Sequence, residues 1–190
     1  GVGTVPVGRV ETGTFKVGDK VVIMPSNATA EVKSIESHHV EMQKASAGDN
    51  IGFNLRGVDK KDIRRGDVIG PIDDPPKVVK EFTAQIIVVH HPTAIAPGYT
   101  PVIHAHTSQA AATITELVSK LDARTGGVLE EKPKALKTGD AAIVKIQPLR
   151  PLCLETFTDF PQMGRFALRD MGTTIAAGVV KEINAEWDLK

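Results

Sequence analysis

The dipeptide Gly-Asp recurs at four widely separated places in this sequence. It stands at 18–19, 48–49, 66–67 and 139–140, each time just before a run of strand-favouring residues. The glycine can take a positive φ and the aspartate can accept a local hydrogen bond, which suits a tight turn that enters a strand. A phosphate-binding glycine loop is rejected, because such a loop needs a helix after it. The pair therefore predicts many short strands joined by turns.

Strand-favouring runs bounded by Gly, Pro or Asn fill most of the chain. The span 110–121 is ambiguous, since its Ile, Leu and Val residues form a helical stripe whereas its Ala-Thr-Ile-Thr run suits a strand; we favour the strand. The other predicted strands are 4–13, 15–17, 20–24, 32–36, 51–55, 81–91, 100–107, 141–146, 152–157, 165–171 and 174–183.

This pattern predicts an all-β fold, with two antiparallel β-barrels in tandem. A chain of 190 residues is long enough for two small domains that each bury a core. The boundary is expected at residues 73–77, where two prolines remove hydrogen-bond donors and stiffen the backbone. The predicted domains are 1–74 and 75–190.

Composition limits the kinds of partner and compartment. The 23 basic and 23 acidic residues give zero net charge, so any nucleic-acid contact must come from local patches. Aromatic residues at 4% argue against a sheet that stacks bases on exposed rings. Cys153, the single cysteine, lies in an apolar run and is expected to be a small buried hydrophobe in a reducing compartment.

The sequence shows no secretion signal and no apolar window of the roughly 18 residues that a membrane span needs. The first residue is not Met and the chain starts in strand-like sequence. We therefore expect a cytoplasmic fragment, without membrane contact, whose upstream part is missing.

Alternation along the predicted strands assigns side chains to faces. Val32, Ser34 and Glu36 are expected to share one face. The adjacent histidines at 38–39 and at 90–91 are expected to point to opposite faces of a strand. Such pairs are poor chelators, but they suit the rim of a barrel, with one ring packed and one exposed.

Residues 34–53 form the segment best able to build a small polar site. Glu36, His38 and His39 lie in a short arc, and the chain returns through Asn50 into an apolar strand. Two strand ends that bracket acceptors, imidazoles and an amide can form a polar pocket beside an apolar wall. A solvated hairpin loop is the simpler alternative.

Five basic residues fall within ten positions and form either a solvated face or a phosphate-facing patch. They are Arg56, Lys60, Lys61, Arg64 and Arg65. Arg165 and Arg169 make a second basic group on a turn-rich hairpin. His104 and His106 share a predicted strand face and could bind a metal, but no third ligand is nearby. P-loop, GxSxG and HExxH motifs are absent, so no catalytic residue is assigned.

Several segments together resemble a known family. Residues 3–13, 16–19, 48–52 and 63–68 look like the second domain of a translational GTPase. Residues 36–39 and 164–171 narrow the resemblance to the elongation factor 1-alpha family, the archaeal and eukaryotic counterpart of EF-Tu. The resemblance covers almost the whole chain, and it is closer to archaeal than to eukaryotic sequences. It implies a translation-factor domain 2 barrel followed by an EF-Tu C-terminal-like barrel.

The resemblance implies that the chain binds aminoacyl-tRNA, which the parent factor delivers to the ribosomal A site. GTP and Mg²⁺ would be bound by the upstream domain, so the parent would be a GTPase with its active site outside this chain. The implied partners are aminoacyl-tRNA, the ribosome, the factor's own GTP-binding domain, a guanine-nucleotide exchange factor and release or rescue proteins.

The family's tRNA contacts can be carried over by motif. Glu36 would accept from the terminal ribose or adenine, His38 and His39 would lie at the amino-acid pocket, and Asn50 would touch the aminoacyl group. His39 stands where bacterial members have Arg. Contacts with the T stem would come from the domain predicted at residues 75–190, where Met171 replaces a Gly of the bacterial pattern. The T-stem residues would be His91, Arg169, Asp170, Met171 and Gly172.

Four alternatives remain. One is that the barrels act as a docking platform for release or rescue proteins. The same barrels occur in paralogous translational GTPases: selenocysteine-specific, initiation, and release or rescue factors. A metal-dependent enzyme would use His104 and His106, and stoichiometric zinc in the purified protein would favour it. A purely structural β-module would use its conspicuous residues only for packing between domains.

Overall fold

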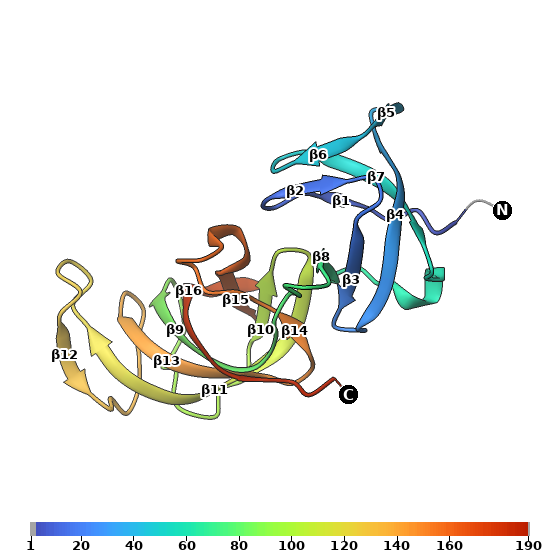
Figure 1. Cartoon of the computed structure of the whole chain (residues 1–190). Coiled ribbons are helices and arrows are strands. Elements are labelled where there is room, and N and C mark those ends of the chain that lie inside the picture. Colours follow the sequence, from blue (N-terminus) through green and yellow to red (C-terminus); the bar gives the residue numbers. More distant parts are fainter. Residues whose placement is uncertain (1–2, 190) are drawn as a thin grey trace. The chain divides into compact units, whose positions relative to one another are not determined.

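Strands are the main regular secondary structure of the chain, in a computed structural model that describes residues 3–189 (Figure 1). Within that range the only helices are two single 3₁₀ turns, η1 (Lys60–Asp62) and η2 (Pro161–Met163). The chain divides into two compact units, one up to Pro76 and one from Lys77 to Asp188. Each unit has its own hydrophobic core. The predicted all-β class is confirmed.

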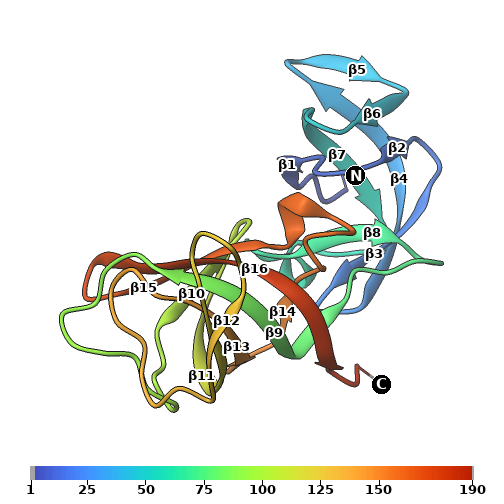
Figure 2. The ribbon, with the colours of Figure 1, turned by 90° about the vertical axis from the view of Figure 1, so that its left-hand side faces the viewer.

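The first unit is a curved antiparallel sheet with a separate two-stranded ribbon (Figure 2). Its strands lie in the order β1-β7-β4-β3-β8, β5 pairs with the end of β4, and β2 pairs with β6. Buried Val, Ile, Leu and Phe side chains fill the space between sheet and ribbon. The strands are β1 (Val7–Arg9), β2 (Thr14–Lys16), β3 (Lys20–Met24), β4 (Ala28–Ser37), β5 (Val40–Met42), β6 (Lys44–Ser46), β7 (Asn50–Arg56) and β8 (Val68–Pro71).

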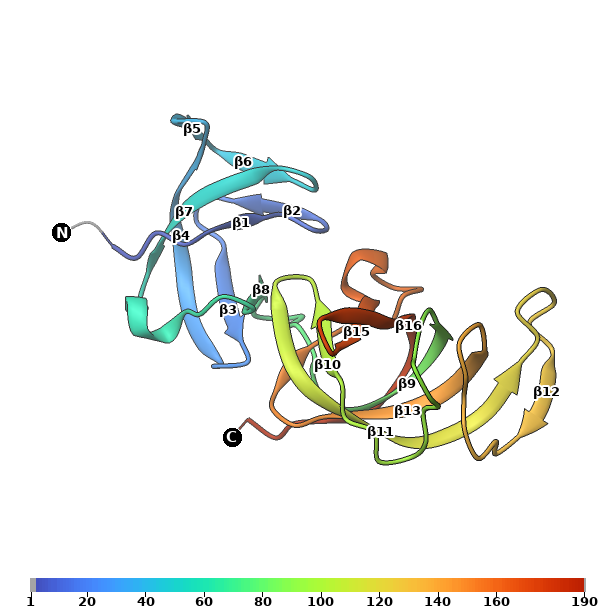
Figure 3. The ribbon, with the colours of Figure 1, turned by 180° about the vertical axis from the view of Figure 1, so that it is seen from behind.

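The strands of the second unit pair in a closed ring. The order β10-β15-β16-β9-β13-β11 returns to β10 through the β10–β11 pairing, and every pairing is antiparallel. Figure 3 shows these strands surrounding the core, with the β11–β12 hairpin extending beyond the ring. The strands are β9 (Val78–Val88), β10 (Val102–Ala105), β11 (Ser108–Leu121), β12 (Val128–Glu131), β13 (Ala141–Pro148), β14 (Leu152–Cys153), β15 (Arg165–Asp170) and β16 (Thr173–Glu186).

The four Gly-Asp pairs form the same turn, as predicted. Each glycine has a φ between 90° and 101°, and each aspartate carboxylate accepts the backbone N–H three residues earlier at 2.7–2.9 Å. A strand begins at the next residue in every case, namely β3, β7, β8 and β13. These turns fix where a strand starts, and therefore which of its residues face the core.

A β-bulge in β4 overturns the predicted faces of that strand. The pairing between β4 and β7 slips between Val32 and Ser34, so one extra residue is inserted. Val32 and Ile35 are consequently both fully buried, whereas Glu36 is exposed. The prediction that Val32, Ser34 and Glu36 share one face was wrong, because it assumed an unbroken two-residue repeat.

Bulges also explain why residues 110–121 resembled a helix. This span is a strand within β11, as favoured, but its pairing with β13 slips between Ile114 and Glu116 and again between Leu117 and Ser119. Ile114, Leu117 and Leu121 are all buried as a result. A bulged strand thus produced three- and four-residue spacings that a regular helix also gives.

Two predicted strands are shorter than expected. Residues 4–13 contain only β1 and an isolated bridge from Thr4 to Leu55. The run 152–157 contains only β14, because the backbone then leaves β9: the amide of Glu155 binds the Met163 carbonyl instead.

Cys153 is buried, as predicted. The described helices are too short and polar to cross a bilayer.

The Gly-Asp turns give a direct test of backbone strain. Gly18 has a φ of 95°, and a Cβ added there would meet no atom within 4 Å. Gly18→Ala should therefore lower the free energy of unfolding by about 1–2 kcal/mol through the left-handed backbone alone. Gly8, whose added Cβ is equally free but whose φ is not positive, supplies the control. Equal urea unfolding curves for Gly18→Ala and Gly8→Ala would contradict this account.

Candidate functional site

His38 and His39 form the two-residue turn between β4 and β5. Ser37 pairs directly with Val40, and the two histidines have φ values of 50° and 62°. Two consecutive positive values define the tight hairpin turn whose twist matches antiparallel strands. The prediction of two rings on opposite faces of a strand was wrong, since neither histidine lies in a strand. The hairpin projects from one end of the first unit (Figures 1 and 2).

Glu36 and His39 face each other across this turn. The Oε1 of Glu36 lies 3.5 Å from the Nδ1 of His39, and their side chains are 57% and 100% exposed. An ion pair this open to water contributes little to stability. Both groups are therefore free to exchange their mutual contact for one with a ligand.

Asn50 is joined to the same hairpin through the backbone. The Ser37 hydroxyl donates to the Asn50 carbonyl at 3.0 Å, and Glu36 pairs across β4 and β7 with Gly52. The structure thus brings Glu36, His38, His39 and Asn50 to one end of the sheet. We call this set of four residues the rim cluster.

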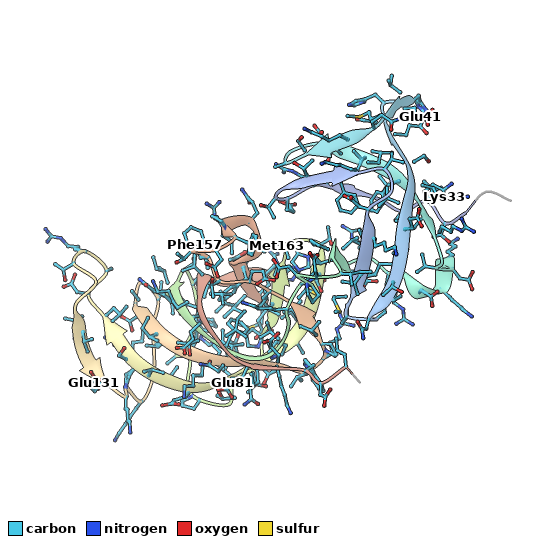
Figure 4. All side chains as sticks on the ribbon, viewed as in Figure 1. Lys33, Glu41, Glu81, Glu131, Phe157 and Met163 are labelled. Atoms are coloured by element: carbon cyan, nitrogen blue, oxygen red, sulfur yellow. The ribbon has the colours of Figure 1, made fainter. Side chains whose placement is uncertain are left out.

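A row of side chains crosses the sheet beside the rim cluster. Val7, Gly52, Glu36 and Glu41 are paired in turn across β1, β7, β4 and β5, so their side chains share one face. Gly52 has no side chain, and a Cβ added there would lie 3.7 Å from Cγ1 of Val5 and 3.9 Å from Cγ2 of Val7, so valine methyl groups border this position of the row. Val7 is 82% exposed. Figure 4 labels Glu41 at the end of the row.

Sequence reasoning missed Val7 and Gly52 as parts of this site. A glycine inside a strand was the available signal, because such a glycine often marks a close approach of a ligand or another backbone. The row therefore offers an apolar surface, a glycine without a side chain and a carboxylate in that order.

The β15–β16 hairpin carries the second set of predicted residues. Met171 and Gly172 form its two-residue turn, with φ values of 53° and 72°. The guanidinium of Arg169 donates from Nη1 to the Thr174 hydroxyl at 2.9 Å and from Nη2 to the Gly172 carbonyl at 3.3 Å. Met171 thus keeps a left-handed backbone where the bacterial pattern has glycine.

Asp170 is held from inside the molecule on both oxygens. The Tyr99 hydroxyl donates to Oδ2 at 2.7 Å, and the Met171 backbone N–H donates to Oδ1 at 2.8 Å. Burial, and next the adjacent Asp170 carboxylate, raise the pKa of the Tyr99 hydroxyl well above its ordinary value of 10.0. Tyr99 therefore remains a proton donor throughout the physiological range. Sequence reasoning did not identify it.

His91 packs against the other side of Tyr99. The two rings meet edge to face, with centroids 5.2 Å apart and an interplanar angle of 87°. Nδ1 of His91 accepts the Thr93 backbone N–H at 3.1 Å, so Nε2 carries the proton in the neutral ring. His91 lies beyond the end of β9 at Val88, so the predicted strand placement of the pair at 90–91 was wrong.

Together these contacts join the two chain segments that carry the five predicted T-stem residues at one tyrosine. We call His91, Arg169, Asp170, Met171 and Gly172 the hairpin cluster. Tyr99 connects its two chain segments, since it touches His91 and Asp170.

The histidines considered for a metal do not share a strand face. His104 lies in β10, whereas His106 lies in the following turn with a φ of 43°. The Nε2 of His106 is 2.9 Å from the Cys153 carbonyl, which it meets as a donor. Among residues 3–189, no three His, Cys, Asp or Glu side chains are grouped so that they could hold a metal ion.

The five residues of the predicted basic patch are all exposed: Arg56 ends β7, and the other four lie on the connection from β7 to β8. Lys61 makes a loose ion pair with Asp59 at 3.9 Å. The Arg64 backbone N–H donates to Asp67, which shapes the turn that carries Arg64 and Arg65. The backbone of the basic patch is thus held at Arg64, and its charged side chains are exposed.

Asp67 makes this turn sensitive to pH. Burial raises the pKa of its carboxyl above the ordinary value of 3.8, although the Arg64 hydrogen bond and charge oppose this. Because the pKa of Asp67 is raised in the folded state, the protonated carboxyl contributes fully to the free energy of unfolding below pH 3.8. That contribution is lost as the pH rises through the folded-state pKa.

Asp67→Asn removes that loss while keeping an oxygen that can accept the Arg64 N–H. The free energy of unfolding of the variant, relative to wild type, should therefore increase as the pH rises from below 3.8 through the folded-state pKa of Asp67, and then level off. Urea unfolding across this range measures it. A difference that stays constant with pH would contradict the assignment.

Comparison with known proteins finds matches over both units. Residues 3–70 match the family Elongation factor Tu domain 2, and residues 81–181 match the family GTP-eEF1A C-terminal domain-like. Curated relatives named Elongation factor 1-alpha are 70% identical over 98% of this chain in Cenarchaeum symbiosum and 63% identical over 96% in Hyperthermus butylicus. The chain spans 43% and 42% of the length of these relatives.

Two solved structures of a related protein match the fold of both units. Two structures of sup35, one complexed with GDP and one with GMPPNP, match with a TM-score of 0.90 at 34% and 33% identity. Each match covers 97% of this chain and 45% of the other.

Proposed function

Because the chain belongs to the elongation factor 1-alpha family, we propose that it is the aminoacyl-tRNA-binding part of a GTP-dependent translation elongation factor. The parent factor delivers aminoacyl-tRNA to the ribosomal A site. Residues 1–74 act as its domain 2 and residues 75–190 as its domain 3. In this proposal, GTP and Mg²⁺ are bound by a part of the factor that this chain, which spans 43% of the Cenarchaeum symbiosum relative, does not include. The setting is the cytoplasm.

The row at the rim cluster is the observation that best supports this proposal. An exposed valine, a glycine without a side chain and a carboxylate suit a nucleoside, whose base needs an apolar surface and whose hydroxyl and amino groups need an acceptor. Glu36 accepts from the terminal ribose or adenine. His38, His39 and Asn50 lie beside the esterified amino acid.

The hairpin cluster suits double-stranded RNA. An A-form helix presents phosphates and 2′-hydroxyls, which a guanidinium, an imidazole and a carboxylate can bind without reading much sequence. A carrier of many amino acids needs contacts of this shared kind. Zero net charge with local basic groups gives binding that can be reversed.

The exposed basic patch faces RNA or the ribosome in this proposal. Further partners are the factor's own GTP-binding domain, a guanine-nucleotide exchange factor, and release or rescue proteins. A paralogous carrier remains the rival, and identities of 63–70% to elongation factor 1-alpha against 33–34% to sup35 favour the elongation factor.

Protection of the aminoacyl ester tests the function. In a chimera, this chain replaces the matching 43% of the Cenarchaeum symbiosum relative. With GTP present, the chimera should slow spontaneous hydrolysis of several elongator aminoacyl-tRNAs, because the ester is enclosed. Protection of only the initiator or selenocysteinyl species would indicate a paralogue. Protection of none would reject tRNA carriage.

Glu36 and Glu41 give a matched test of the rim cluster. The two carboxylates stand directly opposite each other, and both are exposed. Removing a negative charge near RNA should strengthen binding slightly by Coulomb's law. We expect Glu36→Ala instead to weaken aminoacyl-tRNA binding about tenfold, through loss of a charged hydrogen bond. Glu41→Ala should bind as tightly as wild type or tighter.

Titration of aminoacyl-tRNA with the chimera and each variant provides the measurement. Equal affinity of wild type and Glu36→Ala would remove Glu36 from the site. Equal weakening by both variants would point to a general change in the hairpin.

A further inference from the structure

The Tyr99 side chain touches both segments of the hairpin cluster. Its hydroxyl donates to Asp170, and its ring packs edge-on against His91. His91 follows β9, whereas Asp170 ends β15, so these residues are 79 positions apart in sequence. Their relative placement therefore depends on what lies between them.

The barrel fixes the position of Tyr99. The Ile114 backbone N–H donates to the Tyr99 carbonyl at 2.8 Å, and the Tyr99 N–H donates to Ala96 at 3.2 Å. Its ring is half-buried and packs against the core of the second unit. The tyrosine is thus set in place by the fold and does not need RNA to order it.

The His91 segment is anchored in the same way. Its backbone N–H donates to the Thr138 hydroxyl at 3.0 Å, and that hydroxyl donates back to the His91 carbonyl at 3.2 Å. The amides of Val89 and His90 both donate to the Ile175 carbonyl. Only side-chain rotation is left open, and both the Tyr99 ring and the Thr93 N–H that donates to Nδ1 restrict it.

We propose that Tyr99 is a positioning residue for RNA binding, which holds the His91 imidazole and the Asp170 carboxylate at a fixed separation. This inference rests on the proposed function of the hairpin cluster. Nothing in the family resemblance assigned Tyr99 a role, and Tyr99 itself does not need to touch RNA.

The chemistry explains why a carboxylate here must be held still. An acidic group beside RNA is repelled by phosphates, and it is useful only where it accepts a hydrogen bond. In an A-form minor groove the donors are the 2′-hydroxyls and the guanine amino group. Asp170 has both oxygens occupied from inside, so its remaining lone pairs point in defined directions.

Fixing the pair in advance also lowers the cost of binding. An imidazole N–H and a carboxylate at set positions can meet an acceptor and a donor of the RNA without losing rotamer freedom on association. A mobile aspartate would lose that freedom and would sample positions near phosphate. Tyr99 thus makes an acidic residue compatible with an RNA-binding surface.

Tyr99→Phe isolates the hydroxyl, because the ring remains to pack against the core and His91. Thr100→Ala is the control: it removes a hydroxyl from the next residue, which bonds to Gly98 and Thr113 and not to Asp170. Three-bond NMR couplings across χ1 of Asp170 in the 190-residue chain report its rotamers. Wild type and Thr100→Ala should show one rotamer, and Tyr99→Phe should show averaging.

A double-mutant cycle connects this to RNA. In the chimera with GTP, Tyr99→Phe should weaken aminoacyl-tRNA binding about fivefold, the size of coupling seen between contacting groups. In an Asp170→Ala background the same substitution should change affinity less than about twofold, because no carboxylate is left to position. A merely structural tyrosine would weaken binding equally in both backgrounds.

The outcomes separate the two proposals. An unchanged Asp170 rotamer in Tyr99→Phe, or equal losses in both backgrounds, would overturn the positioning role while tRNA carriage stands. Failure of the wild-type chimera to bind aminoacyl-tRNA would overturn the proposed function, and the RNA role of Tyr99 with it. Averaged rotamers together with a non-additive loss of affinity would support both.

Discussion

The left-handed backbone conformation is the constraint on which this structure depends. Antiparallel strands must reverse direction within a few residues, and the tight turns that do so need a positive φ. At the four Gly-Asp turns a glycine takes that conformation without strain. At the two candidate sites other residues take it, namely His38, His39 and Met171. Non-glycine residues in this region are often associated with function.

The strands themselves were predictable because their punctuation is local. A Gly-Asp turn depends on a few adjacent residues, so the dipeptide predicts both the turn and the strand that follows. Which residues of β4 and β11 face the core was harder to predict. A bulge is a property of the pairing between two strands, and one inserted residue changes every inward position after it.

The residues of the candidate sites could be predicted where they belong to a sequence motif. Glu36, Asn50 and Asp170 come from recognisable segments, and the fold brings each group together. Tyr99 could not be predicted from the sequence. Its importance comes from a hydrogen bond across 71 positions, and no local pattern encodes such a contact. Gly52 gave a signal, a glycine within a strand, that acquires meaning only beside Val7 and Glu36.

The two clusters differ in how firmly their acidic groups are held, and the difference fits the proposed division of labour. The Glu36–His39 contact is exposed and 3.5 Å long, so it can rearrange around varied aminoacyl groups. Asp170 is fixed by two internal hydrogen bonds of 2.7 and 2.8 Å, one from a half-buried tyrosine. A mobile contact suits the part of a ligand that varies, and a preorganised one suits the part that is constant. Selectivity for RNA over other anions would then come from the hairpin cluster, where an acid placed without support would repel the phosphates.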